Sequence, residues 1–289
     1  MPNLKPRVVL ITGCSSGFGF LTALKFARHG WQVWASVRKM GVGAQELKNI
    51  AKTENLNLRV IKIDVTDDVE IKTAVTQILR IVGRIDLLIN NAGFGYLGPI
   101  EEFLVEEVQK LYDANIFGPL RTMQAVLPTM RRQKSGRIIN ISSVNGLLAF
   151  GLYGIYSSSK FALETISESL RFEVKPFGVD VVIIEPGSFI TEFSQNIKLA
   201  KKYVSSATAY GGLKDPLSRI SAQNHLKQNQ WVKKIVDPQK VADKLYQIAN
   251  LDKTKIRYKI GFDTHLYTLI RKIVPDSIWE KILHRAYRW

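Results

Sequence analysis

The sequence predicts an α/β domain built on a doubly wound parallel sheet. Short apolar runs rich in Val, Ile and Leu alternate with longer stretches of helical period up to about residue 185, and no repeat or linker divides the chain. Right-handed crossovers then place helices on both faces of the sheet, and ligands bind outside the carboxyl ends of the strands. The strand candidates are Val8–Ile11, Val33–Val37, Leu58–Ile63, Leu87–Asn90, Ile138–Ile141 and Val179–Ile184.

Helix-length segments separate these strands, and the alternation breaks only after the sixth strand. The irregular stretch from about residue 188 to 236 is typical of a functional lid or of a disordered segment. A helix at Val241–Ala249 and a strand at Arg257–Gly261 complete a single predicted domain of residues 1–262. The clearest helical segments are Phe18–His29, Val69–Val82 and Tyr153–Lys175.

The sequence pattern of residues 263–289 predicts a basic, amphipathic helical extension. Apolar residues recur at helical spacing in its first half, and after Pro275 the pair Ser277 and Glu280 resembles a capping box that opens a second helix. Such helices pack on a domain, lie on an anionic membrane or contact another subunit. We favour packing on the domain and keep membrane contact and subunit contact as alternatives.

Composition indicates a globular protein of a reducing compartment. Of the 289 residues, 46% are hydrophobic and 23% are charged, as in ordinary folded domains. Cys14 is the single cysteine, so no intrachain disulfide is expected and a cytoplasmic location is favoured. The N-terminus enters a strand by Val8, which leaves no room for a signal peptide, and no apolar run is long enough for a spanning helix.

The net charge of +16 allows attraction to nucleic acid, to anionic lipid or to a phosphate-bearing cofactor. The basic residues are spread along the chain, with some thickening after Lys198, and do not form one stripe. We therefore interpret most of this charge as solvated surface and expect no specific nucleic-acid partner.

A glycine-rich turn follows the first strand candidate and leads into a helix. Glycine permits positive φ and the close approach of a pyrophosphate, while the start of the helix offers free N–H groups and a favourable dipole. A plain glycine-rich turn would show the same letters, but the position between the first strand and helix favours a dinucleotide site. Its predicted cofactor contacts are Gly13, Ser15, Ser16, Gly17, Phe18 and Gly19.

The end of the second strand favours NADP(H) over NAD(H). An acidic residue at this point would bind the 2′-hydroxyl of the adenine ribose, whereas a basic residue suits a 2′-phosphate. The segment from Ser36 to Lys39 contains no Asp or Glu, and Arg38 supplies the positive charge.

Tyr156 and Lys160 lie one helical turn apart at the start of a predicted long helix, so they share a face. A nearby ammonium stabilises a phenolate and lowers the pKa of tyrosine, which suits it to acid–base work near neutral pH. Ser143, at the end of the fifth strand candidate, can hydrogen-bond the same substrate oxygen.

From residue 7 to about residue 191, the chain resembles the short-chain dehydrogenase/reductase family, which has a Rossmann-type fold. No single motif decides the match, but the ordered set is specific. Besides the glycine turn, it comprises Asp64, Asn90-Asn91-Ala92-Gly93, Asn115, Asn140-Ile141-Ser142-Ser143, Tyr156 with Lys160, Pro186-Gly187 and Thr191. The Cys14-Ser15-Ser16 turn and the Ser36-Val37-Arg38 strand end resemble the retinol and 17β-hydroxysteroid dehydrogenase branch.

The resemblance implies a role for each catalytic residue. Tyr156 would exchange a proton with the substrate oxygen, Ser143 would polarise that oxygen, and Lys160 would bind the nicotinamide ribose. Asn115 would hold a water molecule that relays protons, and a homodimer or homotetramer is common in the family. Further implied cofactor contacts are Asp64, Val65, Asn91, Ala92, Gly93, Pro186, Gly187 and Thr191.

The predicted substrate cleft is lined by apolar and aromatic residues, which favours a lipophilic substrate, although about half of these side chains fit a core position equally well. We therefore predict an NADP(H)-dependent oxidoreductase of lipid metabolism and no metal site. A non-catalytic dinucleotide sensor on the same fold is the alternative, and the complete catalytic set speaks against it. Beside Ser143 and Tyr156, the predicted substrate residues are Phe94, Tyr96, Leu148, Phe150 and Phe189, with Phe193 close by.

Overall fold

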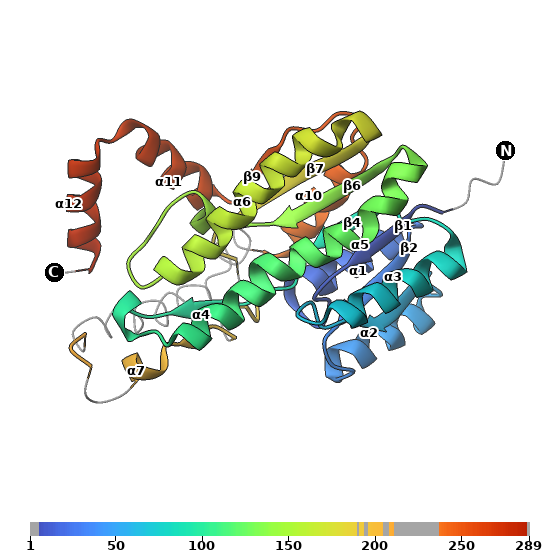
Figure 1. The fold of residues 1–289 in the computed structure, drawn as a ribbon, viewed down its shortest axis with the longest axis horizontal. Helices are drawn as coiled ribbons and strands as arrows, with labels where there is room; N and C mark the ends of the chain where they lie inside the picture. Colours follow the sequence, from blue (N-terminus) through green and yellow to red (C-terminus); the bar gives the residue numbers. More distant parts are fainter. Residues whose placement is uncertain (1–5, 190, 194–195, 205–207, 211–236, 288–289) are drawn as a thin grey trace.

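A seven-stranded sheet forms the centre of the molecule, and every neighbouring pair of its strands is parallel. The computed structural model describes residues 6–189, 191–193, 196–204, 208–210 and 237–287. The strand order β3-β2-β1-β4-β6-β7-β9 reverses direction between β1 and β4, which confirms the predicted doubly wound fold (Figure 1). The strands are β1 (Val8–Ile11), β2 (Gln32–Val37), β3 (Leu58–Lys62), β4 (Leu87–Asn90), β6 (Gly136–Ile141), β7 (Val179–Pro186) and β9 (Arg257–Ile260).

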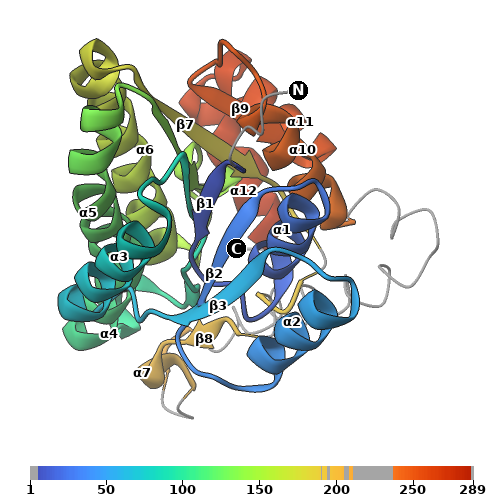
Figure 2. The ribbon, with the colours of Figure 1, turned by 90° about the vertical axis from the view of Figure 1, so that its right-hand side faces the viewer.

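Helices cover both faces of this sheet (Figure 2). Two apolar clusters account for the two layers, because alternate strand residues point to opposite faces. One face carries α1 (Gly17–Arg28), α2 (Val42–Thr53) and α10 (Gln239–Ala249). The other face carries α3 (Asp68–Val82), α5 (Gly118–Gln133) and α6 (Gly154–Val174).

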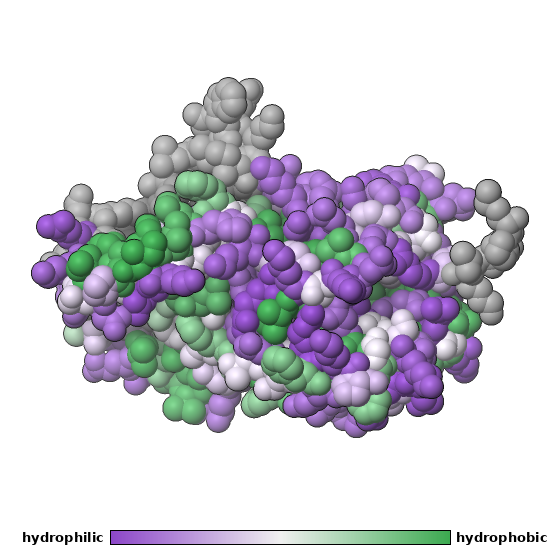
Figure 3. Space-filling view, turned by 90° about the horizontal axis from the view of Figure 1, so that it is seen from above, coloured by the Kyte–Doolittle hydropathy of each residue, from purple (hydrophilic) through white to green (hydrophobic). Residues whose placement is uncertain are grey.

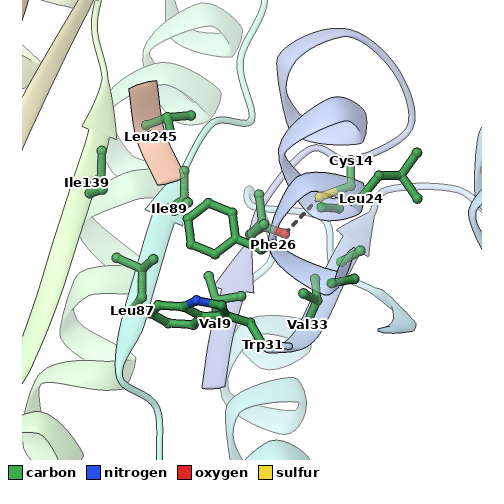
Figure 4. Packing of buried hydrophobic residues seen from close by; sticks show 14 of the residues in the cluster. Val9, Cys14, Leu24, Phe26, Trp31, Val33, Leu87, Ile89, Ile139 and Leu245 are labelled. Atoms are coloured by element: carbon green, nitrogen blue, oxygen red, sulfur yellow. Dashed lines mark hydrogen bonds between the residues drawn. The ribbon is translucent and has the colours of Figure 1, made fainter. Parts of the chain in front are cut away.

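Packing of α1 against the sheet fixes the position of its N-terminus. Phe26 points from α1 toward the strands, and its ring contacts those of Trp31 at 5.1 Å and Tyr246 at 5.4 Å between centroids (Figure 4). Leu245 of α10 adds to the same buried cluster. The start of α1 is therefore held at the carboxyl end of β1, next to the point where the strand order reverses.

Short elements join the strands at the site. The segments between β4 and β6 and after β6 include η1 (Ile100–Glu102), α4 (Val105–Tyr112), the π-helical η2 (Asp113–Phe117) and η3 (Val144–Gly146), and η4 (Lys175–Phe177) precedes β7. Within the predicted lid of residues 188–236, β8 (Lys198–Leu199) pairs with β5 (Tyr96–Leu97), and α7 (Lys201–Val204) follows. The lid residues 211–236 lie outside the described residues.

The predicted C-terminal extension forms α11 (Phe262–Ile273) and α12 (Asp276–Tyr287), which project beyond the sheet at one end (Figure 1). Thr264 is the buried residue of α11, and the ring of Phe150 contacts Tyr267 and Trp279 at centroid distances of 5.9 and 6.3 Å. Packing of the whole tail on the domain stays a prediction. In the described part of the chain, no helix has the length and apolar character needed to cross a membrane.

Candidate active site

The glycine turn after β1 leaves no space for side chains. Gly13 and Gly17 have φ values of +71° and +57°, which side chains rarely tolerate. A Cβ on Gly13 would lie 2.7 Å from the Cα of Ala92, and one on Gly19 would lie 2.3 Å from the carbonyl oxygen of Gly13. No side chain of Ser16 caps α1, so the first N–H groups of this helix can bind an anion.

The segment after β4 holds this turn in place. The Asn91 Nδ2 donates to the carbonyl oxygens of Thr12 and Gly13, each at 2.9 Å. The Thr12 Oγ1 accepts from the backbone N–H groups of Asn91 and Ala92, each at 3.0 Å. The predicted cofactor residues of the two segments are therefore brought together.

The predicted adenine end of the site also assembles from separate segments. Arg38 and Lys39 line one pocket with Asp64 and Thr66, and the Thr66 hydroxyl donates to Asp64 Oδ1 at 2.8 Å. Val65 is buried beneath α5, where a Cβ on Gly118 would lie 2.9 Å from it. Lys62, Asp67, Asp68 and Glu70 also line this pocket, so cations that can bind a phosphate lie beside carboxylates that can accept from ribose or adenine.

The predicted nicotinamide end lies where β7 ends. Thr191 packs against Gly17, because a Cβ on that glycine would lie 3.5 Å from the Thr191 Cβ. The Gly187 N–H donates to the carbonyl oxygen of Ile260 at 2.9 Å, continuing the pairing of Pro186 with the same residue. Asp263, which the sequence analysis missed, accepts from the backbone N–H of Ser188 at 2.6 Å and so fixes this turn.

Ser143, Tyr156 and Lys160 come together where β6 ends and α6 begins. Ser143 is the second residue after β6, and its Oγ accepts from the Asn145 N–H at 3.2 Å. Burial raises the pKa of Tyr156, while a hydrogen bond with Ser143 lowers it. The net rise differs from the lowering that we predict from Lys160. In this structure Tyr156 therefore carries its proton at neutral pH.

The position of Lys160 explains that difference. Its Nζ donates to the carbonyl oxygen of Ile141 at 2.9 Å and lies 5.8 Å from the centre of the Tyr156 ring. Burial lowers the pKa of Lys160 to about 8, and the neighbouring Glu164 acts in the opposite direction. Desolvation thus weakens the positive charge of Lys160 and opposes the phenolate of Tyr156 at the same time.

Asn115 lies in the π-helical turn η2, a distortion often found at functional sites. Its side chain is buried and exchanges two hydrogen bonds with the backbone of Phe94, at 3.1 and 3.0 Å. Its Nδ2 also lies 3.2 Å from the hydroxyl oxygen of Ser159, the neighbour of Lys160. The structure therefore ties Asn115 to the cleft segment after β4, and the predicted water relay stays a prediction.

Aromatic side chains surround Tyr156. Its ring lies 5.9 Å from that of Phe193, and it shares a buried cluster with Tyr96 and Tyr203. The rings of Phe94 and Tyr96 contact each other at 5.5 Å. Tyr203 lies in the stretch to which the sequence analysis assigned no regular structure, and its aromatic character is the only signal that could have singled it out.

The other predicted substrate residues lie in different surroundings. Phe189 packs edge-on against Phe18 at 5.6 Å and belongs to the main core cluster beside the glycine turn. Leu148 is buried and its N–H donates to the Val144 carbonyl oxygen, whereas the ring of Phe150 contacts Tyr267 and Trp279 of the C-terminal helices. Their contact with a substrate stays a prediction.

This arrangement combines a glycine turn at the start of α1 with a buried tyrosine and lysine one turn apart on α6, the helix that connects β6 to β7. The family model described as "short chain dehydrogenase" matches residues 7–202. The chain belongs to the short-chain dehydrogenase/reductase family. It is therefore an NAD(P)(H)-dependent oxidoreductase that acts on alcohol and carbonyl groups, and the predicted resemblance is confirmed.

Several known proteins are similar over most of the chain. "Uncharacterized oxidoreductase YusZ" of Bacillus subtilis is 35% identical and covers 98% of this chain and 99% of its own. The 3-ketodihydrosphingosine reductase of Bacteroides thetaiotaomicron is 41% identical over 68% of this chain and 70% of its own. Retinol dehydrogenase 8 of Bos taurus, from the branch that the sequence resembles, is 37% identical over 74% and 68%.

Solved structures agree with these relatives. A short-chain dehydrogenase from Streptomyces avermitilis is 32% identical, with a TM-score of 0.79 over 96% of this chain and 97% of its own. ElxO, solved with NADP bound, is 25% identical, with a TM-score of 0.71 over 89% of this chain and 96% of its own.

Proposed function

We propose that this protein interconverts a lipophilic alcohol and its carbonyl compound with NADP(H). The observation that carries the proposal is the position of Tyr156, buried and protonated among aromatic rings, with Ser143 and Lys160 beside it. A buried tyrosine that retains its proton is suited to donate it to a carbonyl oxygen. An apolar lining favours a lipophilic carbonyl over a sugar or a charged metabolite.

The chain's own residues perform the proton chemistry. Ser143 Oγ holds the substrate oxygen next to Tyr156, whose phenol donates its proton during reduction and takes one up during oxidation. Lys160, whose Nζ donates to the Ile141 carbonyl in this structure, would bind the nicotinamide ribose and supply the positive charge that stabilises the phenolate. When bound, the dinucleotide supplies or accepts the hydride. The glycine turn, Asn91 and Thr191 hold it in the cleft.

Relatives support the lipophilic substrate class. One relative is a 3-ketodihydrosphingosine reductase and another is a retinol dehydrogenase, and both substrates have long apolar portions. NADPH consumption with retinal, steroid ketones, long-chain keto compounds and small polar ketones tests the proposal. Turnover of an apolar carbonyl supports it, and turnover of polar ketones alone refutes the substrate class. Tight NADPH binding without turnover of any carbonyl or alcohol favours the sensor alternative.

Arg38→Asp is expected to weaken NADP(H) binding by about 10- to 100-fold, the range that one or two charge-assisted hydrogen bonds provide. The acidic side chain repels the 2′-phosphate and accepts from the 2′-hydroxyl of NAD(H), so the relative preference for NAD(H) rises. Fluorescence titrations with both cofactors measure the change. Lys48→Asp on the exposed face of α2 is the charge-matched control. Equal effects of both variants would leave Arg38 without its assigned role.

We further propose that the exposed face of the C-terminal helices, opposite any face that packs on the domain, meets an anionic membrane surface. Apolar side chains gather at the end of the molecule where α11 and α12 lie, and hydrophilic residues border them (Figure 3). Arg271, Lys272, Lys281 and Arg285 lie on the same two helices, and each basic residue near an anionic surface contributes about 1 kcal/mol. The exposed apolar residues are Phe262, Leu266, Leu269, Ile273, Ile278 and Ile282.

The double variant Leu269→Glu/Ile273→Glu is expected to abolish binding to phosphatidylglycerol vesicles, because it places charge on the lipid-facing side. Cosedimentation measures the bound fraction, with phosphatidylcholine vesicles as the uncharged comparison. Val42→Glu/Val69→Glu, which alters two exposed residues on α2 and α3, is the charge-matched control and should bind normally. Equal loss with both variants, or no binding by the unaltered protein, contradicts the proposal. Concentration-dependent dimerisation through the same residues would assign this surface to a subunit contact instead.

A further inference from the structure

A buried cluster of charged residues lies directly behind the catalytic lysine. Glu164 on α6 and Glu185 on β7 are both buried, and Arg257 on β9 reaches both of them. The Arg257 Nε lies 3.0 Å from Glu164 Oε2 and 3.5 Å from Glu185 Oε1. Burying charges costs several kcal/mol per ion unless pairing offsets it. Proton transfer at Tyr156 does not by itself require a pair of buried acidic residues.

The residues of this cluster are close to the catalytic residues both in the sequence and in the folded structure. Glu164 follows Lys160 by one turn of α6, so the two side chains lie on one face of the helix. Glu185 follows Ile184, which pairs with Ile141, the residue whose carbonyl accepts from Lys160. Glu164 also contacts the Ser143 loop, because a Cβ on Gly146 would lie 3.3 Å from its Oε1.

The charges in the cluster do not balance. Arg257 is shared among three carboxylates, since its Nη2 also donates to Glu168 Oε2 at 2.7 Å. The Glu168 side chain is 45% exposed and partly screened by water, whereas that of Glu164 is 6% exposed. Among the described residues, neither oxygen of Glu185 has a hydrogen-bond partner. When the three carboxyl groups are ionised, their negative charge exceeds the single positive charge of Arg257.

The negative charge of Glu164 acts on the Lys160 ammonium, one turn earlier on α6. Glu164 raises the pKa of Lys160 against the effect of burial, and burial raises the pKa of Glu185 to about 7. Burial also raises the pKa of Glu164. As the pH rises and these carboxyl groups ionise, their attraction for the Lys160 ammonium grows. The charged and titratable groups facing this region are Tyr153, Tyr156, Lys160, Glu164 and Glu168 of α6, Glu185 of β7, and Arg257 and Lys259 of β9.

We propose that Glu164 is a positioning residue for the reaction: its buried carboxylate, oriented by Arg257 and backed by Glu185, keeps Lys160 charged and directed to the cofactor ribose. This inference rests on the proposed role of Lys160. Arg257 belongs to the last strand of the sheet, so the cluster also links β9 and the start of the C-terminal helices to the catalytic centre.

Glu164→Gln tests the proposal, because it keeps the shape of the side chain and removes the charge. The pKa of Lys160 falls when its negative neighbour is removed, so the ammonium is lost at lower pH. The pH dependence of kcat/KM for carbonyl reduction and that of NADPH affinity, measured by fluorescence, each have an alkaline limb where the value falls as Lys160 loses its proton. In Glu164→Gln both alkaline limbs should shift to lower pH by about one unit, the effect of one nearby charge. Glu164→Asp, which keeps the charge, should restore most of both limbs.

Glu168→Gln is the matched control, because Glu168 binds the same guanidinium from an exposed position. It should leave both limbs in place. Unmoved limbs in Glu164→Gln overturn the inference, as does an equal shift in Glu168→Gln, which would show a general field effect. A uniform loss of activity at every pH also overturns it, since that result indicates a structural role. If no carbonyl is turned over, the proposed function fails, yet the NADPH-binding limb still decides the role of Glu164.

Discussion

Tyr156→Phe is expected to lower kcat/KM for carbonyl reduction by about 1000-fold, within the range that general acid catalysis contributes. The substitution removes one oxygen atom and keeps the ring that contacts Phe193 at 5.9 Å. The cleft and the glycine turn should therefore stay intact, and NADPH affinity should not change. Steady-state kinetics and fluorescence titration of the same preparation separate the two effects.

Tyr153→Phe is the matched control for this variant. Tyr153 lies one turn before Tyr156, packs against the same cluster, and also has its pKa raised by burial. If burial alone determined the effect of removing the hydroxyl, the two variants would lose activity equally. Tyr156 differs from Tyr153 in its contacts with Ser143 and Lys160. Near-normal turnover by Tyr156→Phe would show that another group donates the proton, and an equal loss with Tyr153→Phe would mean that Tyr156 has no special role among the buried tyrosines.

The strands of the sheet could be predicted because burial on both faces leaves a clear pattern. β1 and β4 begin and end at the predicted residues, and β2, β6 and β7 are longer by one or two residues at an end. β7 continues to Pro186 because the edge strand β9 pairs with it there. That pairing depends on residues about seventy positions further along the chain, which local periodicity does not contain.

The ordered motifs also predicted the candidate catalytic residues that the structure brings together, because their spacing along the chain is itself the signal. What sequence alone did not show is how side chains distant in the chain act on those residues. Glu164 is one polar residue among several on α6, and its effect on Lys160 requires Arg257, which lies on another element. In the same way, the role of Asp263 in fixing the turn after β7 follows only from its hydrogen bond with the backbone N–H of Ser188.

The two aromatic residues that follow β7 lie in different surroundings. Phe189 follows the Pro186-Gly187 turn and is predicted to contact the substrate, and its ring lies against Phe18 in the core beside the glycine turn. The ring of Phe193, four residues later, lies 5.9 Å from that of Tyr156. The surroundings of each ring depend on the path of the backbone after β7, and composition cannot determine that path.

Gly19→Ala is expected to weaken NADPH binding by at least about 100-fold, which equals about 2.8 kcal/mol at 1.4 kcal/mol per tenfold change. The added Cβ would lie 2.3 Å from the Gly13 carbonyl oxygen and 2.5 Å from Asn91 Nδ2, so the turn and its supporting amide must both shift. Those shifts displace the N–H groups that face the pyrophosphate. Fluorescence titration of NADPH measures the loss, and thermal unfolding of the free protein checks the fold.

This expectation runs against the intrinsic preference of the helix. Gly19 lies inside α1, where alanine would otherwise stabilise a helix by about 1 kcal/mol relative to glycine. Gly41→Ala, which adds a Cβ to open space at the start of α2, is the control and should leave binding unchanged. A stable Gly19→Ala protein with normal NADPH affinity would mean that the turn does not bind the pyrophosphate. A folded protein that has lost binding would show that close packing at Gly19, rather than helix propensity, keeps glycine at this position.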